Sequence, residues 1–174
     1  MRKVKLFVAN SLDNFIARPD GGVDWLFTDG DYGMRAFFKS VDTALMGRKT
    51  YDWTLAHGGS PDAFKGMTYY VFSRSRRKRA EAAGGVRFVS GDVRSFVESL
   101  RRAEGKDIWL MGGGELTESF LRERLIDEFI LTVHPTLLGA GLPLFRGSYP
   151  QTDLKLLKCK TYKTGLVQLS YGLK

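Results

Sequence analysis

Three consecutive glycines, Gly112, Gly113 and Gly114, separate the apolar run at 108–111 from a helical pattern that includes Glu115 and Leu116. Residues without Cβ let a ligand approach the backbone, and the N–H groups and macrodipole of a following helix attract anions. The spacing is not the G-x-G-x-x-G of a Rossmann fingerprint. By itself the turn is either a phosphate site or a tight strand-to-helix connection without a ligand.

A second candidate anion site, Gly47-Arg48-Lys49-Thr50, follows the buried run at 43–46. In open α/β sheets ligands collect at the carboxyl ends of the strands. The planar guanidinium of Arg48 suits a phosphate better than a lysine does. The alternative is a solvated, basic start of a helix.

The third segment, Ser73-Arg74-Ser75, ends the apolar run at 68–72 and leads into the basic residues 76–79. Two hydroxyls and a guanidinium would serve a 2′-phosphate well. Basic runs are more often solvated faces, and they also occur as nucleic-acid patches. This run lacks interleaved aromatic residues, which argues against a nucleic-acid-binding module.

The elements that must position these segments alternate between strand and helix through the first two-thirds of the chain. Strands are expected at residues 4–9, 43–46, 68–72, 86–89, 108–111, 128–134, 154–162 and 166–171. Helices are expected at residues 32–39, from Arg48, from the N-cap Asp92 toward Gly105, and over the stripe Leu116, Phe120, Leu121 and Leu125. The pattern predicts one α/β domain over residues 1–174. Its mainly parallel sheet carries helices on both faces and ends in an antiparallel edge hairpin around Gly165.

Composition sets limits on function. With 174 residues, 43% hydrophobic and 26% charged, the chain matches a globular domain, and its apolar runs are far too short to span a membrane. The N-terminus lacks a signal-peptide core, and Cys159 is the only cysteine, so we expect a cytoplasmic protein without disulfides. Two histidines argue against a metal centre. The net charge of +8 implies anionic partners without choosing among them.

Taken together and in this order, the segments VANSLDNFIA (8–17), MGRKTY (46–51), SRS (73–75) and IWLMGGGEL (108–116) resemble the dihydrofolate reductase superfamily. Within it, ILTVHPTLLGAG (130–141) is similar to the reductase domain of riboflavin biosynthesis, in a stand-alone form. This resemblance implies a three-layer αβα fold of the dihydrofolate reductase type. The zinc-binding deaminase domain that accompanies the reductase in that family is not found within these residues.

The resemblance also implies a cofactor and a reaction. NADPH would donate a hydride, with its pyrophosphate at residues 112–116, its adenosine phosphates at residues 47–50 and 73–75, and its nicotinamide beside Ala9 and Ile16. In the riboflavin branch the ribosylamino group of a phosphorylated pyrimidine is reduced to a ribitylamino group. The expected partners are a small anionic or heteroaromatic substrate and a second copy of the chain, without nucleic acid or membrane.

Catalytic residues are the least defined part, because the cofactor carries the chemistry and the protein positions the reactants. Folate reductases have a carboxylate at the start of the first helix, and counting back from Gly47 without gaps assigns Asp31 to that role. Asp29 and Asp31 are equally good helix N-caps. Asn10 and Trp25 are assigned to the substrate side, although an aromatic residue such as Trp25 is often simply core. A true folate reductase and a broad-specificity reductase remain alternatives.

Overall fold

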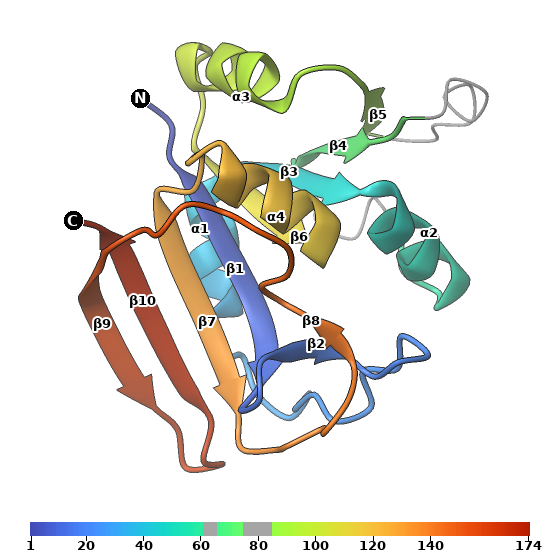
Figure 1. Ribbon diagram of the computed structural model, residues 1–174, viewed down its shortest axis with the longest axis vertical. Coiled ribbons are helices and arrows are strands. Elements are labelled where there is room, and N and C mark those ends of the chain that lie inside the picture. Colours follow the sequence, from blue (N-terminus) through green and yellow to red (C-terminus); the bar gives the residue numbers. More distant parts are fainter. Residues whose placement is uncertain (61–65, 75–84) are drawn as a thin grey trace.

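The computed structural model describes residues 1–60, 66–74 and 85–174, in which it forms ten strands and four helices (Figure 1). The strands are β1 (Val4–Ser11), β2 (Phe15–Ala17), β3 (Val41–Gly47), β4 (Thr68–Phe72), β5 (Val86–Val89), β6 (Asp107–Gly112), β7 (Glu128–His134), β8 (Leu142–Pro143), β9 (Leu154–Thr161) and β10 (Val167–Leu173). The helices are α1 (Met34–Ser40), α2 (Arg48–Ala56), α3 (Val93–Arg102) and α4 (Gly114–Arg122).

Eight of the described strands form one sheet in the order β5-β4-β3-β6-β1-β7-β10-β9. The pairs from β5 to β7 are parallel, whereas β10 runs antiparallel to both β7 and β9. The parallel sheet with a C-terminal antiparallel edge is therefore confirmed. Gly165 has a φ of 85° in the turn that joins β9 to β10, a conformation that favours glycine.

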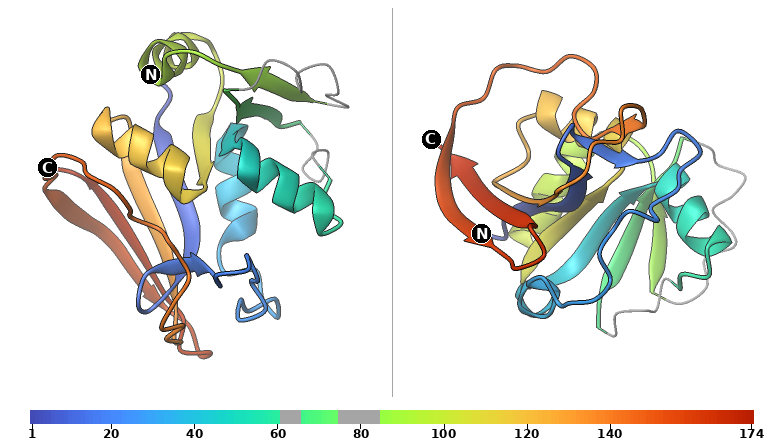
Figure 2. Two further views of the ribbon diagram at one scale, coloured as in Figure 1. Left: turned by 45° about the vertical axis from the view of Figure 1, so that its right-hand side comes forward. Right: turned by 90° about the horizontal axis from the view of Figure 1, so that it is seen from below.

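Helices cover both faces of the sheet (Figure 2). Neighbouring residues of the central strands point to opposite sides, so each face carries apolar side chains against which helices pack. Leu6 and Leu110 pack with α3 and α4 in one buried cluster. Phe7 and Trp109 pack with α1 and α2 in the other. The three-layer αβα arrangement is confirmed.

The helix starts follow local sequence signals with one shift. The carboxylate of Asp92 caps α3 by accepting a hydrogen bond of 2.7 Å from the Ser95 N–H. Helix α1 begins at Met34 rather than at Tyr32, after Gly33 in a left-handed conformation. Among the described helices, α3 is the longest at ten residues, and none has the length and apolar composition needed to cross a membrane.

Strands β2 and β8 were not expected from the sequence. They pair as a separate two-stranded sheet in which Phe15 lies opposite Pro143 and Ala17 opposite Leu142. With three and two residues they are too short to show a period, and they form only because distant segments meet. The pair brings the segment after β8 to the carboxyl edge of the main sheet.

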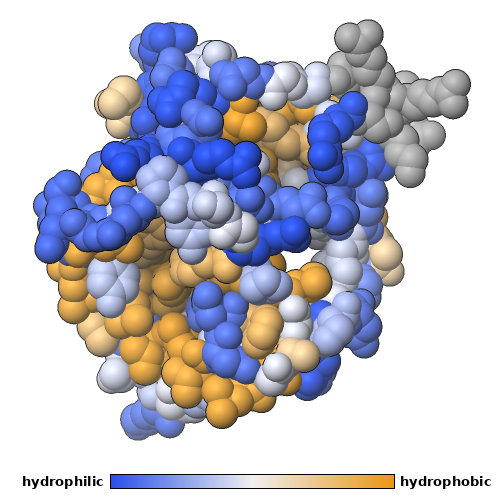
Figure 3. Space-filling view, viewed as in Figure 1, coloured by the Kyte–Doolittle hydropathy of each residue, from blue (hydrophilic) through white to orange (hydrophobic). Residues whose placement is uncertain are grey.

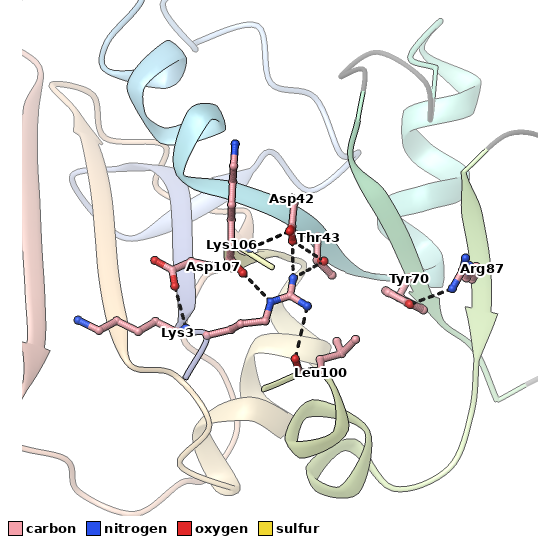
Figure 4. A network of polar contacts seen from close by, with 9 residues as sticks. Lys3, Asp42, Thr43, Tyr70, Arg87, Leu100, Lys106 and Asp107 are labelled. Atoms are coloured by element: carbon pink, nitrogen blue, oxygen red, sulfur yellow. Dashed lines mark hydrogen bonds and ion pairs between the residues drawn. The ribbon is translucent and has the colours of Figure 1, made fainter. Parts of the chain in front are cut away.

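A network of ion pairs and hydrogen bonds around the buried Arg2 ties the strands together at the opposite, amino edge (Figure 4). The guanidinium of Arg2 contacts the Asp42 carboxylate and donates to the Thr43 hydroxyl at 2.6 Å. Asp107, at the start of β6, accepts a 2.9 Å bond from the Lys3 N–H. Because these groups pair with one another where β1, β3 and β6 begin, this edge has a structural role.

Candidate functional site

A cavity of about 1480 Å³ lies along the carboxyl ends of the parallel strands. Its lining includes residues at or just beyond the ends of six neighbouring strands, from Ser90 after β5 to His134 in β7. Five strand spacings of about 4.8 Å make this edge roughly 24 Å long. Because pockets for one drug-sized ligand measure about 300–1,000 Å³, the cavity can hold an extended molecule beside a second one.

Most residues that the resemblance assigns to a cofactor line this one cavity. They are Ala9, Ile16, Gly47, Arg48, Lys49, Thr50, Ser73, Arg74, Gly113, Gly114, Glu115 and Leu116. Gly112 is not part of the lining that the described residues form. Ser75 and the basic run at 76–79 lie outside the described residues.

The glycine turn is held by a threonine from the neighbouring helix. Gly113 is the N-cap of α4, and its N–H donates a hydrogen bond of 2.9 Å to Oγ1 of Thr50 in α2. Gly112 has a φ of 100°, and its peptide bond to Gly113 is cis. Since β3 and β6 are adjacent in the sheet, this hydrogen bond joins the starts of the two helices that follow them.

The first turn of α4 presents backbone donors. In the described part of the chain, the N–H groups of Gly114, Glu115 and Leu116 have no hydrogen-bond acceptor, as is usual for the first turn of a helix. A Cβ on Gly114 would stand 2.9 Å from the Pro143 carbonyl oxygen, so no side chain fits there. This close approach fixes the segment after β8 against the turn.

Helix α2 contributes a second N-terminus to the same place. Its N-cap, Gly47, has an extended backbone (φ −76°, ψ 155°) without a capping side chain. A Cβ on Gly47 would lie 3.8 Å from Leu116 Cβ and 4.0 Å from the Gly112 carbonyl oxygen, in ordinary contact. Two positive helix ends therefore face one stretch of the cavity, which favours an anion.

Three cations from separate elements gather around Glu115. Its carboxylate lies 2.7 Å from Lys49 Nζ, 3.8 Å from the Arg146 guanidinium and 3.9 Å from that of Arg74. The hydrogen bond from Lys49 lowers the pKa of Glu115 most, the charges of Arg146 and Arg74 lower it further, and burial opposes them. Glu118 also lies 3.8 Å from Arg146, so three positive charges face two negative ones and this stretch is cationic.

Arg146 was missed by sequence reasoning, because no motif or spacing marks it. Arg48 instead forms an ion pair of 2.7 Å with Asp52 and lies 5.1 Å from the centre of the Phe88 ring. Its guanidinium is therefore directed toward β5, on the side of the cavity where Ser73 is buried.

The end of the cavity beside β1 and β7 is aromatic and uncharged. Thr132 Oγ1 accepts a 3.2 Å hydrogen bond from Gln168 Nε2, which also donates to the Tyr32 carbonyl at 3.0 Å. His134 Nδ1 lies 3.1 Å from the Thr132 carbonyl, and its Nε2 accepts from the Phe27 N–H at 3.2 Å. These partners assign the neutral tautomer, and burial lowers the pKa of His134.

Three residues that the sequence assigned to catalysis or substrate, Asp31, Asn10 and Trp25, are not part of the cavity lining that the described residues form. Asp31 lies in the loop before α1, where its carboxylate accepts from the backbone N–H groups of Gly33 (3.2 Å) and Arg35 (3.0 Å). An ungapped count from Gly47 cannot locate a loop residue.

Asn10 and Trp25 are also absent from the lining that the described residues form. Asn10 is buried, and it points to the opposite face of β1 from its neighbour Ala9, which lines the cavity. Trp25 packs edge-on against His134, with ring centres 5.2 Å apart. Trp25 therefore supports the wall from behind.

The segments 8–17 and 130–141, which both belong to the family resemblance, are bonded to each other. Asp13 accepts hydrogen bonds from the N–H groups of Leu138 (3.0 Å) and Gly139 (2.8 Å), and from the Ser11 hydroxyl at 2.6 Å. The Ser11 bond contributes most to lowering the pKa of Asp13, and the backbone bonds add to it. This clamp holds β2, and with it Ile16, against the cavity. The described residues include no cluster of His, Cys, Asp and Glu that could hold a metal ion.

A parallel sheet in this strand order, with a long cleft and two helix N-termini at its carboxyl edge, defines an α/β protein of the dihydrofolate reductase-like type. The chain belongs to the RibD C-terminal domain family, whose sequence profile matches residues 2–168. Membership supports an oxidoreductase fold related to riboflavin biosynthesis.

Known proteins agree with this assignment. The uncharacterized protein YwjB of Bacillus subtilis strain 168 is 38% identical over 98% of this chain and 97% of its own length. A crystal structure of a protein assigned to riboflavin biosynthesis from Shewanella sp. PV-4 has a TM-score of 0.87 at 29% identity, covering 99% of both chains. Dihydrofolate reductase from Enterococcus faecalis, complexed with NADP(H), shares the fold, with a TM-score of 0.71 at 13% identity over 99% of this chain and 96% of that one.

Proposed function

We propose that residues 1–174 form a single-domain, cytoplasmic, NADPH-dependent reductase acting on a ribosylamino-pyrimidine phosphate of the riboflavin type. The observation that carries the proposal is the meeting of the α2 and α4 N-termini with three cations at the adjoining ends of β3 and β6. A diphosphate is the ligand group that this combination of donors and charge favours. Family membership and the fold shared with an NADP(H)-binding reductase add support.

The described residues fit the cofactor along the length of the cavity. The pyrophosphate would lie between Gly47 and the amides of residues 114–116, which have no acceptor among the described residues. Lys49, Ser73 and Arg74 would hold the adenosine phosphates. The nicotinamide would lie between Ala9 and Ile16, at the uncharged end. Bound there, NADPH supplies the hydride.

The protein then has to orient a substrate beside the nicotinamide and keep water out. Phe27, Tyr32 and Trp109 provide apolar walls. Because Thr132 Oγ1 accepts from Gln168, its own O–H is left to donate to a carbonyl or ring nitrogen of a substrate. His134 stays neutral and engaged at both nitrogens, so its part is to hold the wall and not to transfer a proton.

This uncharged end favours the neutral pyrimidine ring of such a substrate over dihydrofolate. A folate reductase uses a carboxylate beside its substrate, and Asp31, the residue assigned to that role, is exposed outside the cavity lining. The phosphate of a pyrimidine ribosyl phosphate would benefit from the net charge of +8.

The test is a fluorescence titration with NADPH followed by NADPH-oxidation assays with the pyrimidine ribosyl phosphate and, in parallel, with dihydrofolate. Saturable NADPH binding and turnover of the pyrimidine alone are expected. Turnover of dihydrofolate alone would assign the chain to the folate branch. Absence of NADPH binding at moderate salt would refute the cofactor.

Association into a homodimer is a second part of the proposal, and an apolar sheet face supports it. The register sets Leu131, Leu169 and Cys159 in one row, and Tyr171 beside Leu156, which is 56% exposed. Figure 3 shows apolar surface over β7, β10 and β9. A second copy presenting the same uncharged patch would bury it without burying charge.

Sedimentation of wild type and Leu156→Asp tests the dimer. The wild type should sediment as a dimer and the variant as a monomer. Lys158→Asp is the matched control, because Lys158 pairs with Ser170 in the register and lies on the other face of β9. A monomeric wild type would refute this part.

A further inference from the structure

Arg146 follows β8 in a segment whose backbone is packed tightly against α4. Leu144 is only 1% exposed, and its N–H donates to the Asn14 carbonyl at 3.0 Å. Gly147 has a φ of 73°, and a Cβ there would fall 2.2 Å from the carboxylate of Glu118 in α4. The Cα of Arg146 is therefore fixed beside the first turns of α4.

The guanidinium of Arg146, by contrast, is weakly engaged. Its recorded ion pairs within the described residues are 3.8 Å to Glu115 and 3.8 Å to Glu118. Each of these carboxylates has a closer cation, Lys49 at 2.7 Å and Arg122 at 2.7 Å. The side chain of Arg146 is 47% exposed, and ion pairs of this length and exposure contribute little to stability.

The side chain of Arg146 lies beside the N-terminus of α4. A Cβ on Gly114 would meet Arg146 Cδ at 3.0 Å, so the arginine stem crosses the glycine turn itself. The amides of Gly114 and Glu115 approach an anion from the helix, and Lys49 approaches from α2. Arg146 reaches the same place from the β8 side.

We propose that Arg146 binds the pyrophosphate of the dinucleotide, closing over it from the side opposite the α4 amides. The proposal rests on the proposed function and adds a residue to it. The guanidinium exchanges two long carboxylate contacts for paired hydrogen bonds to phosphate oxygens, which its planar geometry favours. Glu115 and Glu118 hold the guanidinium near this position beforehand.

The alternative is that Arg146 has only a structural role and ties its segment to α4. Measuring the Kd of NADPH and of NADH for variants of Arg146 separates this structural role from a role in binding the pyrophosphate. Both nucleotides carry the pyrophosphate, and only NADPH carries the 2′-phosphate. Arg146→Gln should raise the Kd of both by about tenfold, and Arg146→Lys should raise both by less, because charge is kept and the paired geometry lost. Arg74→Gln should raise the Kd of NADPH more than that of NADH, because only NADPH carries the 2′-phosphate.

The control is Arg94→Gln in α3, which removes an exposed arginine paired with Glu123 at 2.9 Å, outside the cavity lining. It should leave both Kd values unchanged, which would show that the loss of one positive charge from the protein does not by itself weaken nucleotide binding. Equal Kd values in Arg146→Gln and wild type would overturn the proposal while leaving the proposed function intact. Failure of the wild type to bind either nucleotide would overturn both. The melting temperature of Arg146→Gln should be close to that of wild type. If the melting temperature of Arg146→Gln is lower, the Kd values of Arg146→Lys are compared with those of wild type instead.

Discussion

Replacing Gly47 by aspartate puts a negative charge at the point where α2 and α4 face one another. The backbone at Gly47 is extended, and the nearest heavy atoms to a new Cβ lie 3.8 Å and 4.0 Å away. The site therefore accepts a side chain without a steric conflict. Asparagine and aspartate are also good N-caps, so the free energy of unfolding should change by less than about 0.5 kcal/mol.

The effect on an anionic ligand should be much larger. At about 5 Å and an effective dielectric constant of about 20, two unit charges repel by about 3 kcal/mol. Such a repulsion between the new carboxylate at Gly47 and a bound pyrophosphate would raise the Kd of NADPH on the order of 100-fold. Gly47→Asn adds nearly the same volume without the charge and is the matched control.

Titration of NADPH fluorescence at several salt concentrations measures this effect. The gap between Gly47→Asp and Gly47→Asn should narrow as ionic strength rises, because salt screens charges over about 10 Å at 0.1 M. Equal Kd values for the two variants at low salt would refute the reasoning, since a phosphate could not then lie between the two helix N-termini. Urea unfolding of both variants excludes a general loss of structure.

Three further predictions concern the residues around the cavity. Thr50→Val removes the acceptor of the 2.9 Å bond from the Gly113 N–H, and should lower the free energy of unfolding by about 1 kcal/mol and weaken NADPH binding. Urea unfolding and titration measure this, and wild-type values in both would contradict it. Burial lowers the pKa of His134, so the histidine stays neutral in the folded chain as pH falls below about 6.5, where the unfolded chain takes up a proton. The free energy of unfolding should therefore decline between pH 7 and pH 5, and His134→Gln should make this decline smaller. If the free energies of unfolding of wild type and His134→Gln fall in parallel with pH, His134 does not cause the decline. Asp31→Asn should change kcat by less than about threefold, whereas loss of a general acid costs about 100-fold or more.

Much of the cleft could be predicted because its parts are encoded locally. Each cofactor segment follows a strand, and parallel strands bring their carboxyl ends to one edge, so recognising the strands was enough to gather Gly47, Ser73 and Gly113. The residues on the substrate side of the cavity were harder to predict from the sequence. Asp31 depended on a count through a loop, and Asn10 depended on which face of β1 a residue occupies, a one-residue difference that reverses its side.

By itself, the sequence determined the succession of the four helices and of the eight strands of the main sheet, the resemblance to the family, and the glycine turn as either an anion site or a plain connection. Apolar periodicity, N-caps and glycines act over a few residues, so they are readable in a linear chain. Only the tertiary structure decided how Thr50 holds Gly113, how Asp13 joins the segment at 138–139 to the start of β2, and that Arg146 reaches the α4 N-terminus. The first two contacts join residues that are 63 or more positions apart in the sequence. The third joins Arg146 to the start of α4 through the packing of the segment after β8 against that helix. No local pattern encodes them, because their energy arises only after the sheet has formed.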